Sequence, residues 1–318
     1  MEGTKPGLFV SLQFHSRDSV VGVVLYHPNE GAVALTLSRL APSARAMIAV
    51  ANSSVSDSFR QRLEAAAGST PLEIIEPIAN LGLGAAYNQL LQRAEGLGAR
   101  YLLLLDQDSS PSSEMLPQLE QHMASLKADG CGPAVVGPQP VEPGGRRLRL
   151  AIAQKVATPR HGVTPVAFII SSGSLVSVEE IQRVGPFRED FFIDAVDLEW
   201  CMRAWARGRT VWAVTSVPMV HRLGRGVIQT PLGLRLVDQP PARIYTYFRN
   251  QFAMLRLSHV PMRWKARFLL SLPIRCLIYL IRHRFSLAAR RAVGLGIFHG
   301  LRGKLGSPVT TWAKIGQP

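Results

Sequence analysis

Short apolar runs alternate with helix-like segments through the first part of the chain, and this alternation restricts the fold more than any other feature. The apolar runs lie at residues 20–26, 46–52, 72–77 and 101–106. Helical patterns lie between them, at residues 31–40, 56–67 and 84–95. Continuous apolar runs are typical of strands that are covered on both faces. Repeated strand–helix units predict an α/β fold with a doubly wound, mostly parallel sheet, which binds ligands at the carboxyl ends of its strands.

The middle of the chain continues this pattern with further strands and an amphipathic helix. The strands are expected at residues 133–138, 166–174 and 210–214. The helix is contained in the segment FFIDAVDLEWCMRAWARG and ends at Gly208. A loop then runs to Pro240. We therefore assign residues 1–240 to one α/β domain and residues 241–318 to a helical carboxyl-terminal region.

The excess of basic residues is concentrated at the carboxyl end. The formal net charge of the chain is +14. Residues 239–318 contain fourteen Lys and Arg and no Asp or Glu, whereas residues 1–238 contain 22 basic and 22 acidic residues. A formally neutral body therefore carries a polycationic tail, and such a tail favours an anionic partner.

Helical patterns that mix apolar and basic residues occupy this tail. They are expected at residues 244–258, 263–285 and 287–301. The most apolar run, 269–281, contains Pro273 and Arg275 and is shorter than the ~20 apolar residues of a spanning helix. It fits a basic amphipathic segment on an anionic membrane surface. A solvated basic surface and a nucleic-acid interface are the alternatives. The tail has no recognised nucleic-acid module, so we favour the membrane surface and expect no nucleic acid.

Cysteine usage and the N-terminal segment bear on the compartment. Cys131, Cys201 and Cys276 are widely separated and odd in number, which favours a reducing compartment over a disulfide framework or a zinc site. Residues 1–20 lack a basic segment followed by a long apolar core, so no signal peptide is predicted.

Two aspartates stand directly at the end of one apolar run, in LLLLDQDSSP. Because side chains alternate along a strand, Asp106 and Asp108 are expected to point roughly the same way. Adjacent carboxylates repel each other unless a cation or proton lies between them, and oxygen ligands suit Mg²⁺ or Mn²⁺. The alternative is that Asp108 caps the following helix while Asp106 is solvated.

Four stretches in this order and spacing resemble one enzyme family. They are NLGLGAAYNQLL, LLLLDQDSSP, FIISSGSLVS and FFIDAVDLEWCMR, and VHRLG follows them. Together they resemble the inverting family 2 glycosyltransferases, in particular the bacterial rhamnosyltransferase branch, over about residues 20–260. The resemblance implies a GT-A-like nucleotide-binding fold, a divalent cation, a dTDP-L-rhamnose donor and inversion at the anomeric carbon.

The resemblance also implies roles for the acidic residues. Asp106, Asp108 and His221 would hold Mg²⁺ or Mn²⁺ against the donor diphosphate, with Asp108 as the direct ligand, and Asp106 is alternatively a ribose contact. Asp197 falls at the position of the catalytic base, which takes the proton of the acceptor hydroxyl. Asp194 is assigned to the acceptor side or to a helix cap. Trp200 either stacks on a sugar or packs in the core.

Further polar and glycine residues are carried over as donor contacts by the same resemblance. These residues are Asn52, Asn80, Gly82, Asn88, Asp106, Ser172, Gly173 and Arg249. Gly84 is instead assigned to close helix packing, and Arg249 is alternatively a helix-surface residue. Ala51 stands where the family usually has an acid that reads the nucleotide base, so the choice of donor base is left open.

The expected function is that of an inverting rhamnosyltransferase. It would transfer L-rhamnose from dTDP-L-rhamnose to a hydroxyl of a lipid-borne saccharide or glycolipid in cell-surface polysaccharide or rhamnolipid biosynthesis. The enzyme would lie peripherally at the cytoplasmic face of the inner membrane, held by its tail. The alternatives are the same fold with another nucleotide-hexose donor, and a catalytically degenerate homologue that binds membranes.

Overall fold

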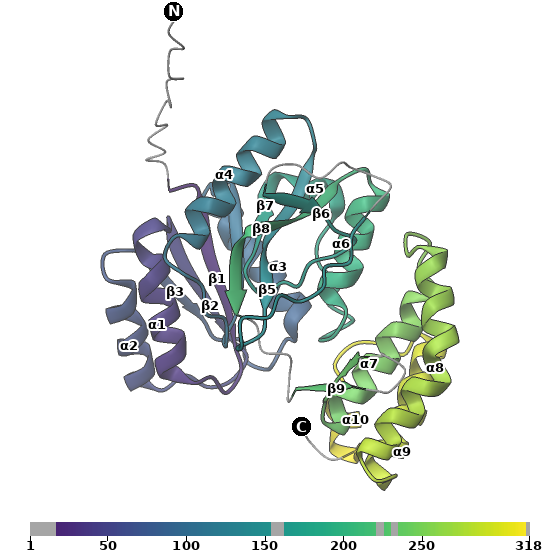
Figure 1. Cartoon of the computed structure of the whole chain (residues 1–318). Helices are drawn as coiled ribbons and strands as arrows, with labels where there is room; N and C mark the ends of the chain where they lie inside the picture. The colour runs from purple at the N-terminus through teal and green to yellow at the C-terminus, as the bar shows by residue number, and fades with distance from the viewer. Residues whose placement is uncertain (1–16, 154–161, 221–225, 230–234, 316–318) are drawn as a thin grey trace, which may run out of the picture.

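A computed structural model describes residues 17–153, 162–220, 226–229 and 235–315 and shows a sheet with helices on both faces (Figure 1). The sheet has eight strands in the order β3-β2-β1-β4-β7-β5-β8-β6. In chain order they are β1 (Ser19–Leu25), β2 (Ala46–Ala51), β3 (Leu72–Ile75), β4 (Tyr101–Asp106), β5 (Pro133–Val141), β6 (Val163–Pro165), β7 (Ser174–Ser177) and β8 (Thr210–Val220). A second, antiparallel sheet pairs β9 (Val227–Gln229) with β10 (Arg235–Val237).

The first four strands are parallel to one another, as the sequence predicts. β1 pairs with β2 and β4, and β2 pairs with β3. β7 runs antiparallel between β4 and β5, β8 is parallel to β5, and β6 is an antiparallel edge strand. In this register Leu25 lies opposite Ala51, and Val24 lies opposite Asp106. The carboxyl ends of β1, β2 and β4 therefore meet at one edge of the sheet.

Helices cover both faces of the sheet, and each face has its own buried cluster (Figure 1). The body contains α1 (Glu30–Leu40), the short 3-10 helix η1 (Ala41–Ser43), α2 (Asp57–Ala67), α3 (Leu83–Gly96), α4 (Met115–Ala128), α5 (Val178–Val184) and α6 (Val196–Ala206). On one face, Val21 and Val23 of β1 pack with α1, α2 and α4. On the other, Val20 and Val24 pack with α3 and α6. Because successive side chains of a strand point to opposite faces, β1 contributes buried residues to both cores.

The strand expected at residues 166–174 is misplaced. In the structure the strand is β7, Ser174–Ser177, and it begins where the expected strand ends. The residues before it are a buried loop: Ile169 packs in the core, and Gly173 has a left-handed backbone with φ of 79°. The strand was misplaced because an apolar run indicates only that a segment is buried, and a buried segment can be a strand or a packed loop.

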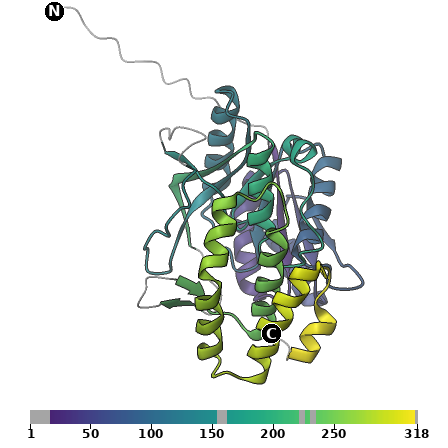
Figure 2. The ribbon, with the colours of Figure 1, turned by 90° about the vertical axis from the view of Figure 1, so that its right-hand side faces the viewer.

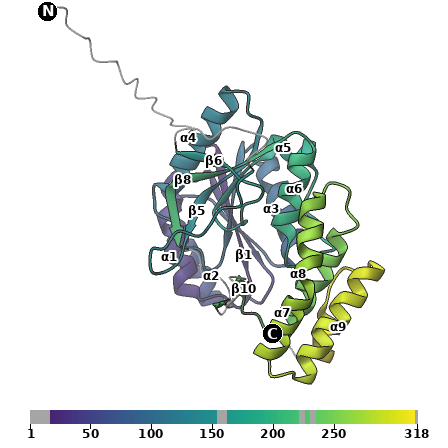
Figure 3. The ribbon, with the colours of Figure 1, turned by 45° about the vertical axis from the view of Figure 1, so that its right-hand side comes forward.

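The described part of the tail, residues 241–315, forms four helices beside the sheet (Figures 2 and 3). They are α7 (Pro241–Met254), α8 (Met262–Arg282), α9 (Leu287–Arg302) and α10 (Val309–Ile315), of which α10 was not expected from the sequence. α7 and α9 lie close together because Gly296 and Gly300 face backbone carbonyls of α7; a Cβ on Gly296 would lie 2.7 Å from the carbonyl oxygen of Tyr245.

α7 contributes to two cores. Its Ala253 and Met254 pack into the cluster under α3 and α6, whereas its Tyr245 and Phe248 pack with α8 and α9. The division of the chain between residues 240 and 241 therefore stays a prediction, although α7 begins at Pro241. Among the residues that the structure describes, no helix has the length and apolar character needed to cross a bilayer.

Candidate active site

Asp106 and Asp108 lie where β4 leaves the sheet, as predicted. Asp106 is the last residue of the strand and is half-buried, and Asp108 is exposed in the turn that follows. Gln107 between them contacts the end of β1: the backbone N–H of Tyr26 donates to its Oε1 at 2.6 Å, and its Nε2 donates to the Tyr26 carbonyl at 3.0 Å. The turn that carries both aspartates is thus tied to the neighbouring strand.

The Asp106 carboxylate has an environment that favours a bound cation. Burial and the carboxylates of Asp108 and Asp197 raise its pKa to about 7. The Tyr87 hydroxyl donates to its Oδ1 at 3.3 Å, and Arg243 lies near enough to oppose this rise in pKa. Like charges gathered in a partly desolvated site repel one another unless a positive charge compensates them.

These residues fit a magnesium- or manganese-type ion. Within the described parts of the chain, no group of three His, Cys, Asp or Glu side chains is placed to hold a metal on its own. Magnesium sites in nucleotide enzymes commonly use one or two carboxylates and complete their coordination with substrate phosphates and water. Asp106 and Asp108 supply such a pair, and His221, the third predicted ligand, lies outside the described residues.

Asp197 lies in the first turn of α6 and joins the same cluster. The backbone N–H of Ser171 donates to its Oδ2 at 3.2 Å, and that of Leu198 donates to its Oδ1 at 2.7 Å. Burial raises the pKa of Asp197, and these backbone donors oppose the rise. The hydroxyl oxygens of Tyr87 and Ser171 are also hydrogen-bonded, 2.7 Å apart. Tyr87 and Ser171 therefore link the carboxylates of β4 and α6.

The segment before α6 is a strained bend. Phe192, Asp194 and Ala195 all have left-handed backbones, with φ between 61° and 68°, at a cost of about 1 to 3 kcal/mol each. Asn250 of α7 stabilises this bend, because its Nδ2 donates to the carbonyls of Ile193 at 2.7 Å and Asp194 at 2.8 Å. The helical pattern read from FFID onward therefore begins late, and α6 starts at Val196.

Asp194 binds a side chain of the tail instead of capping α6. Arg243 of α7 donates to both of its carboxylate oxygens, at 2.6 and 3.2 Å, and the Thr246 hydroxyl donates to it at 2.5 Å. The N-cap of α6 is Ala195, which makes no side-chain cap. Arg243 was not predicted from the sequence, because the tail was considered only as a region of positive net charge. In the structure the Arg243 guanidinium lies beside the acidic residues of the site.

The NLGLG loop (residues 80–84) is held against Asn52, which follows the end of β2. Asn52 accepts from the Leu81 N–H at 3.0 Å, and Asn80 accepts from the Gly82 N–H at 2.8 Å. Gly82, with φ of 80°, precedes α3, where a Cβ would collide with the Phe192 side chain. These groups shape a loop beside the acidic cluster, and their contact with a donor stays a prediction.

Close packing explains Gly84, as expected. A Cβ on this residue would collide with the carbonyl of Arg188. Asn88, one turn further along α3, was assigned to the donor, but its side chain is used inside the fold. Its Oδ1 accepts from the Phe187 N–H at 2.8 Å, and its Nδ2 donates to the Phe187 carbonyl at 2.9 Å. Asn88 therefore fastens the loop before α6 to α3.

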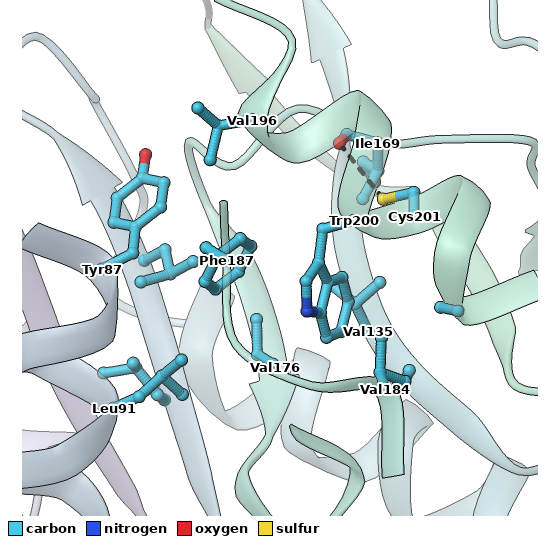
Figure 4. Close-up of a cluster of buried hydrophobic side chains, with 14 of the residues drawn as sticks. Tyr87, Leu91, Val135, Ile169, Val176, Val184, Phe187, Val196, Trp200 and Cys201 are labelled. Atoms are coloured by element: carbon cyan, nitrogen blue, oxygen red, sulfur yellow. Dashed lines mark hydrogen bonds between the residues drawn. The ribbon is translucent and has the colours of Figure 1, made fainter. Parts of the chain in front are cut away.

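Burial selects the packing alternative for Trp200 and corrects the donor assignment of Arg249. Trp200 is 1% exposed, and its ring stacks on Phe187 with centroids 5.1 Å apart, so it cannot meet a sugar (Figure 4). Arg249 is also 1% exposed, and it donates to the carbonyls of Phe191 at 2.7 Å and Gly306 at 2.8 Å. Its guanidinium supports the bend before α6 and does not reach a diphosphate.

Ser172 and Gly173 lie directly beneath the acidic turn. The hydroxyls of Ser172 and Ser109 are 2.6 Å apart, and the Gly173 N–H donates to the Leu104 carbonyl at 2.8 Å. Ser172 is buried, and a Cβ on Gly173 would meet Met219 at 2.7 Å. Both residues support β4, so the predicted direct contact with a donor sugar is replaced by support of the aspartate turn.

Solved structures share this architecture. The 1–349 segment of S. aureus TarS in complex with UDP-GlcNAc matches with a TM-score of 0.55 and 15% identity, over 87% of this chain and 78% of that one. GalNAc-T7 with UDP, GalNAc and Mn²⁺ matches with a TM-score of 0.55 and 12% identity, over 80% of this chain. The chain spans 54% of GalNAc-T7 and 40% of a longer TarS structure. These likenesses show a GT-A fold.

Sequence comparisons show what kind of enzyme the chain resembles. The dTDP-rhamnosyl transferase RfbF of Shigella flexneri is 27% identical over 235 residues, which cover 71% of this chain and 77% of RfbF. Residues 29–185, which contain the β4 aspartates, match the family model described as Glycosyl transferase family 2. The chain is therefore a glycosyltransferase, and its residues 29–185 are similar to glycosyltransferase family 2.

Proposed function

We propose that this enzyme transfers L-rhamnose from dTDP-L-rhamnose to a hydroxyl of a lipid-borne saccharide or glycolipid, at the cytoplasmic face of the inner membrane. The observation that carries the proposal is the cluster of Asp106, Asp108 and Asp197 at the carboxyl end of β4. The similarity to an enzyme described as a dTDP-rhamnosyl transferase supports the donor. The polycationic tail supports the membrane location.

In this reaction Asp197 acts as the general base. One of its oxygens accepts the proton of the acceptor hydroxyl while the acceptor oxygen attacks C1 of the sugar. The bond between C1 and the phosphate oxygen breaks, and its electron pair leaves with dTDP on the opposite side of the ring, so the configuration at C1 inverts. The Ser171 and Leu198 N–H groups hold the carboxylate in place before the reaction.

The leaving diphosphate requires positive charge. A divalent ion held by Asp106 and Asp108 would supply electrostatic stabilisation of that group. Arg243 adds a fixed guanidinium on the same side, because it lies near Asp106 and is oriented by Asp194, to which Thr246 also donates. We assign Arg243 to the donor phosphates, a role that guanidinium groups commonly have.

Substitution of Arg243 by glutamine is expected to lower the rate of transfer more than about tenfold, because it removes one charge from the phosphate site. It also leaves the largely buried Asp194 unpaired, which costs about 3 to 5 kcal/mol. The double variant Arg243→Gln/Asp194→Asn removes that unpaired charge. We expect it to recover the melting temperature but not the rate. Recovery of both would show that Arg243 acts only by holding the bend.

The donor assignment is tested by nucleotide-dependent protection against heating. At about one hundred times its Kd, dTDP with Mg²⁺ or Mn²⁺ is expected to stabilise the protein by about 2.7 kcal/mol. In a protein of this size that raises the melting temperature by about 4 °C. Without the cation, or with GDP, the expected rise is much smaller. Absence of protection by any nucleotide would instead identify a degenerate homologue.

One observation favours a different nucleotide-hexose donor as the second candidate. Ala51, at the end of β2, is 3% exposed and has no side-chain polar atom, so it cannot read a base as an acid would. Protection by UDP equal to that by dTDP, followed by cleavage of a UDP-hexose, would support this candidate over the rhamnose donor.

A further inference from the structure

α8 has one face that packs against the protein. Phe268 and Tyr279 are buried on this face, and the Phe268 ring lies 5.5 Å from the Phe252 ring of α7, measured between centroids. Arg275 on the same side donates to the Tyr247 hydroxyl at 2.8 Å. Residues eleven positions apart in a helix project in nearly the same direction, so Phe268 and Tyr279 define the inward side.

The opposite face of α8 is apolar and exposed. Leu270 is 84% exposed and Met262 is 73% exposed, and they continue into a stripe of large apolar side chains along the helix. The stripe consists of Met262, Leu269, Leu270, Leu277 and Ile281, and Phe285 and Leu287 extend it beyond the helix end. Met262 and Leu269 are seven residues apart, as are Leu270 and Leu277, and Ile281 follows Leu277 by four, as one face of a helix requires. A contiguous exposed stripe of this kind marks an interaction surface.

Positive charge lies beside the stripe. Arg263 and Arg267 are exposed in the first turns of α8, and no acidic side chain of the described residues pairs with either of them. The last acid of the chain is Asp238, and it is already paired with Arg282 at 2.6 Å. The surface therefore combines an apolar stripe with unneutralised arginines.

We propose that the exposed stripe of α8 docks onto the surface of an anionic lipid bilayer. The helix would lie parallel to the membrane, with its leucines at the boundary of the acyl chains and its arginines among the headgroups. Charge decides against a second copy of the chain as the occupant, because self-association through this face would bring two polycationic tails together. A nucleic acid would satisfy the arginines but not the apolar stripe.

Docking through this face would bring the active site close to the lipid surface. α7 lies between the sheet and α8 (Figure 1). One side of α7 presents Arg243 and Thr246 to Asp194, and other residues of α7, Tyr247 and Phe252, contact α8. The acidic cluster would thus be separated from the membrane only by α7 and α8. Only this consequence rests on the proposed lipid-borne acceptor, since the docking itself requires no particular reaction.

Sedimentation of the full-length protein with vesicles tests the proposal. Vesicles of phosphatidylcholine with about one third phosphatidylglycerol are expected to bind the protein roughly tenfold more strongly than phosphatidylcholine alone. Leu270→Glu/Leu277→Glu should reduce binding to the anionic vesicles by roughly tenfold or more. Arg263→Gln/Arg267→Gln should reduce it as well and weaken its dependence on salt. Leu35→Glu, which alters a leucine of α1 that is 53% exposed, is the matched control and should bind like the unaltered protein.

Two results would overturn the proposal. The first is unchanged vesicle binding by Leu270→Glu/Leu277→Glu, with unfolding curves that show the variant to be folded. The second is a dimer, seen by light scattering without lipid, that the same variant dissociates, because a second copy would then occupy the stripe. Protection by dTDP, measured on the same preparations, reports on the donor site alone. If the α8 variants lose vesicle binding but are still protected by dTDP, the proposed reaction is unaffected.

Discussion

Replacement of Asp197 by asparagine is expected to lower the rate of the proposed rhamnosyl transfer about a thousandfold, while the affinity for dTDP stays near that of the unaltered enzyme. The amide cannot accept the proton of the acceptor hydroxyl. It retains the size of the carboxylate, and its Oδ1 can still accept from one of the two N–H groups that hold Asp197. Single-turnover transfer and dTDP titration would measure the two quantities separately.

Glu199 provides the matched control on the same helix. It is 1% exposed and paired with Arg203 through two contacts of 3.0 and 2.9 Å, so Glu199→Gln should lower the melting temperature. At a temperature where both variants are folded, Glu199→Gln should keep its rate. If Asp197→Asn loses dTDP binding in parallel with its rate, Asp197 contributes to the donor site and is not the base.

Replacement of Asp108 by alanine is expected to abolish the dependence on a divalent cation and to lower transfer by at least about a hundredfold, since a metal ion contributes several kcal/mol to such a reaction. The metal-free variant should melt no lower than the unaltered protein. Asp108 is exposed, and its charge raises the pKa of Asp106, so its removal relieves a repulsion. Melting curves with and without Mn²⁺ and dTDP would show both effects.

Glu114 lies further along the same loop and serves as the control for lost charge. It is exposed and forms no side-chain cap on α4. Glu114→Ala should therefore retain both transfer and protection by the cation and dTDP. Cation-dependent protection that survives in Asp108→Ala would contradict the assignment of Asp108 as a metal ligand.

Local patterns were sufficient for the parts of the fold that depend on neighbouring residues. The parallel strands β1, β2, β3 and β4 were predicted within two residues at each end, because continuous burial leaves a distinct apolar run. The aspartates at the end of β4 were found for the same reason: the strand dictates where they emerge. Gly84 was assigned to packing, and the collision of a Cβ with Arg188 agrees.

Contacts between distant segments decided the rest of the site. Asn88, Trp200 and Arg249 are of the residue types that bind sugars and phosphates, yet each is used to hold the loop or bend before α6. The neighbouring sequence is the same whether such a side chain binds a ligand or binds another part of the protein. Only the tertiary packing distinguishes these two roles.

The sequence by itself determined the order of strands and helices in the first half, the acidic pair at a strand end and the separation of a neutral body from a cationic tail. Each of these depends on spacing within a short window. The tertiary structure alone decided that Arg243 of the tail reaches Asp194, some fifty residues earlier, and that α8 turns its leucines outward. The physical reason is that a contact between remote residues depends on how helices pack, and no local pattern records that packing.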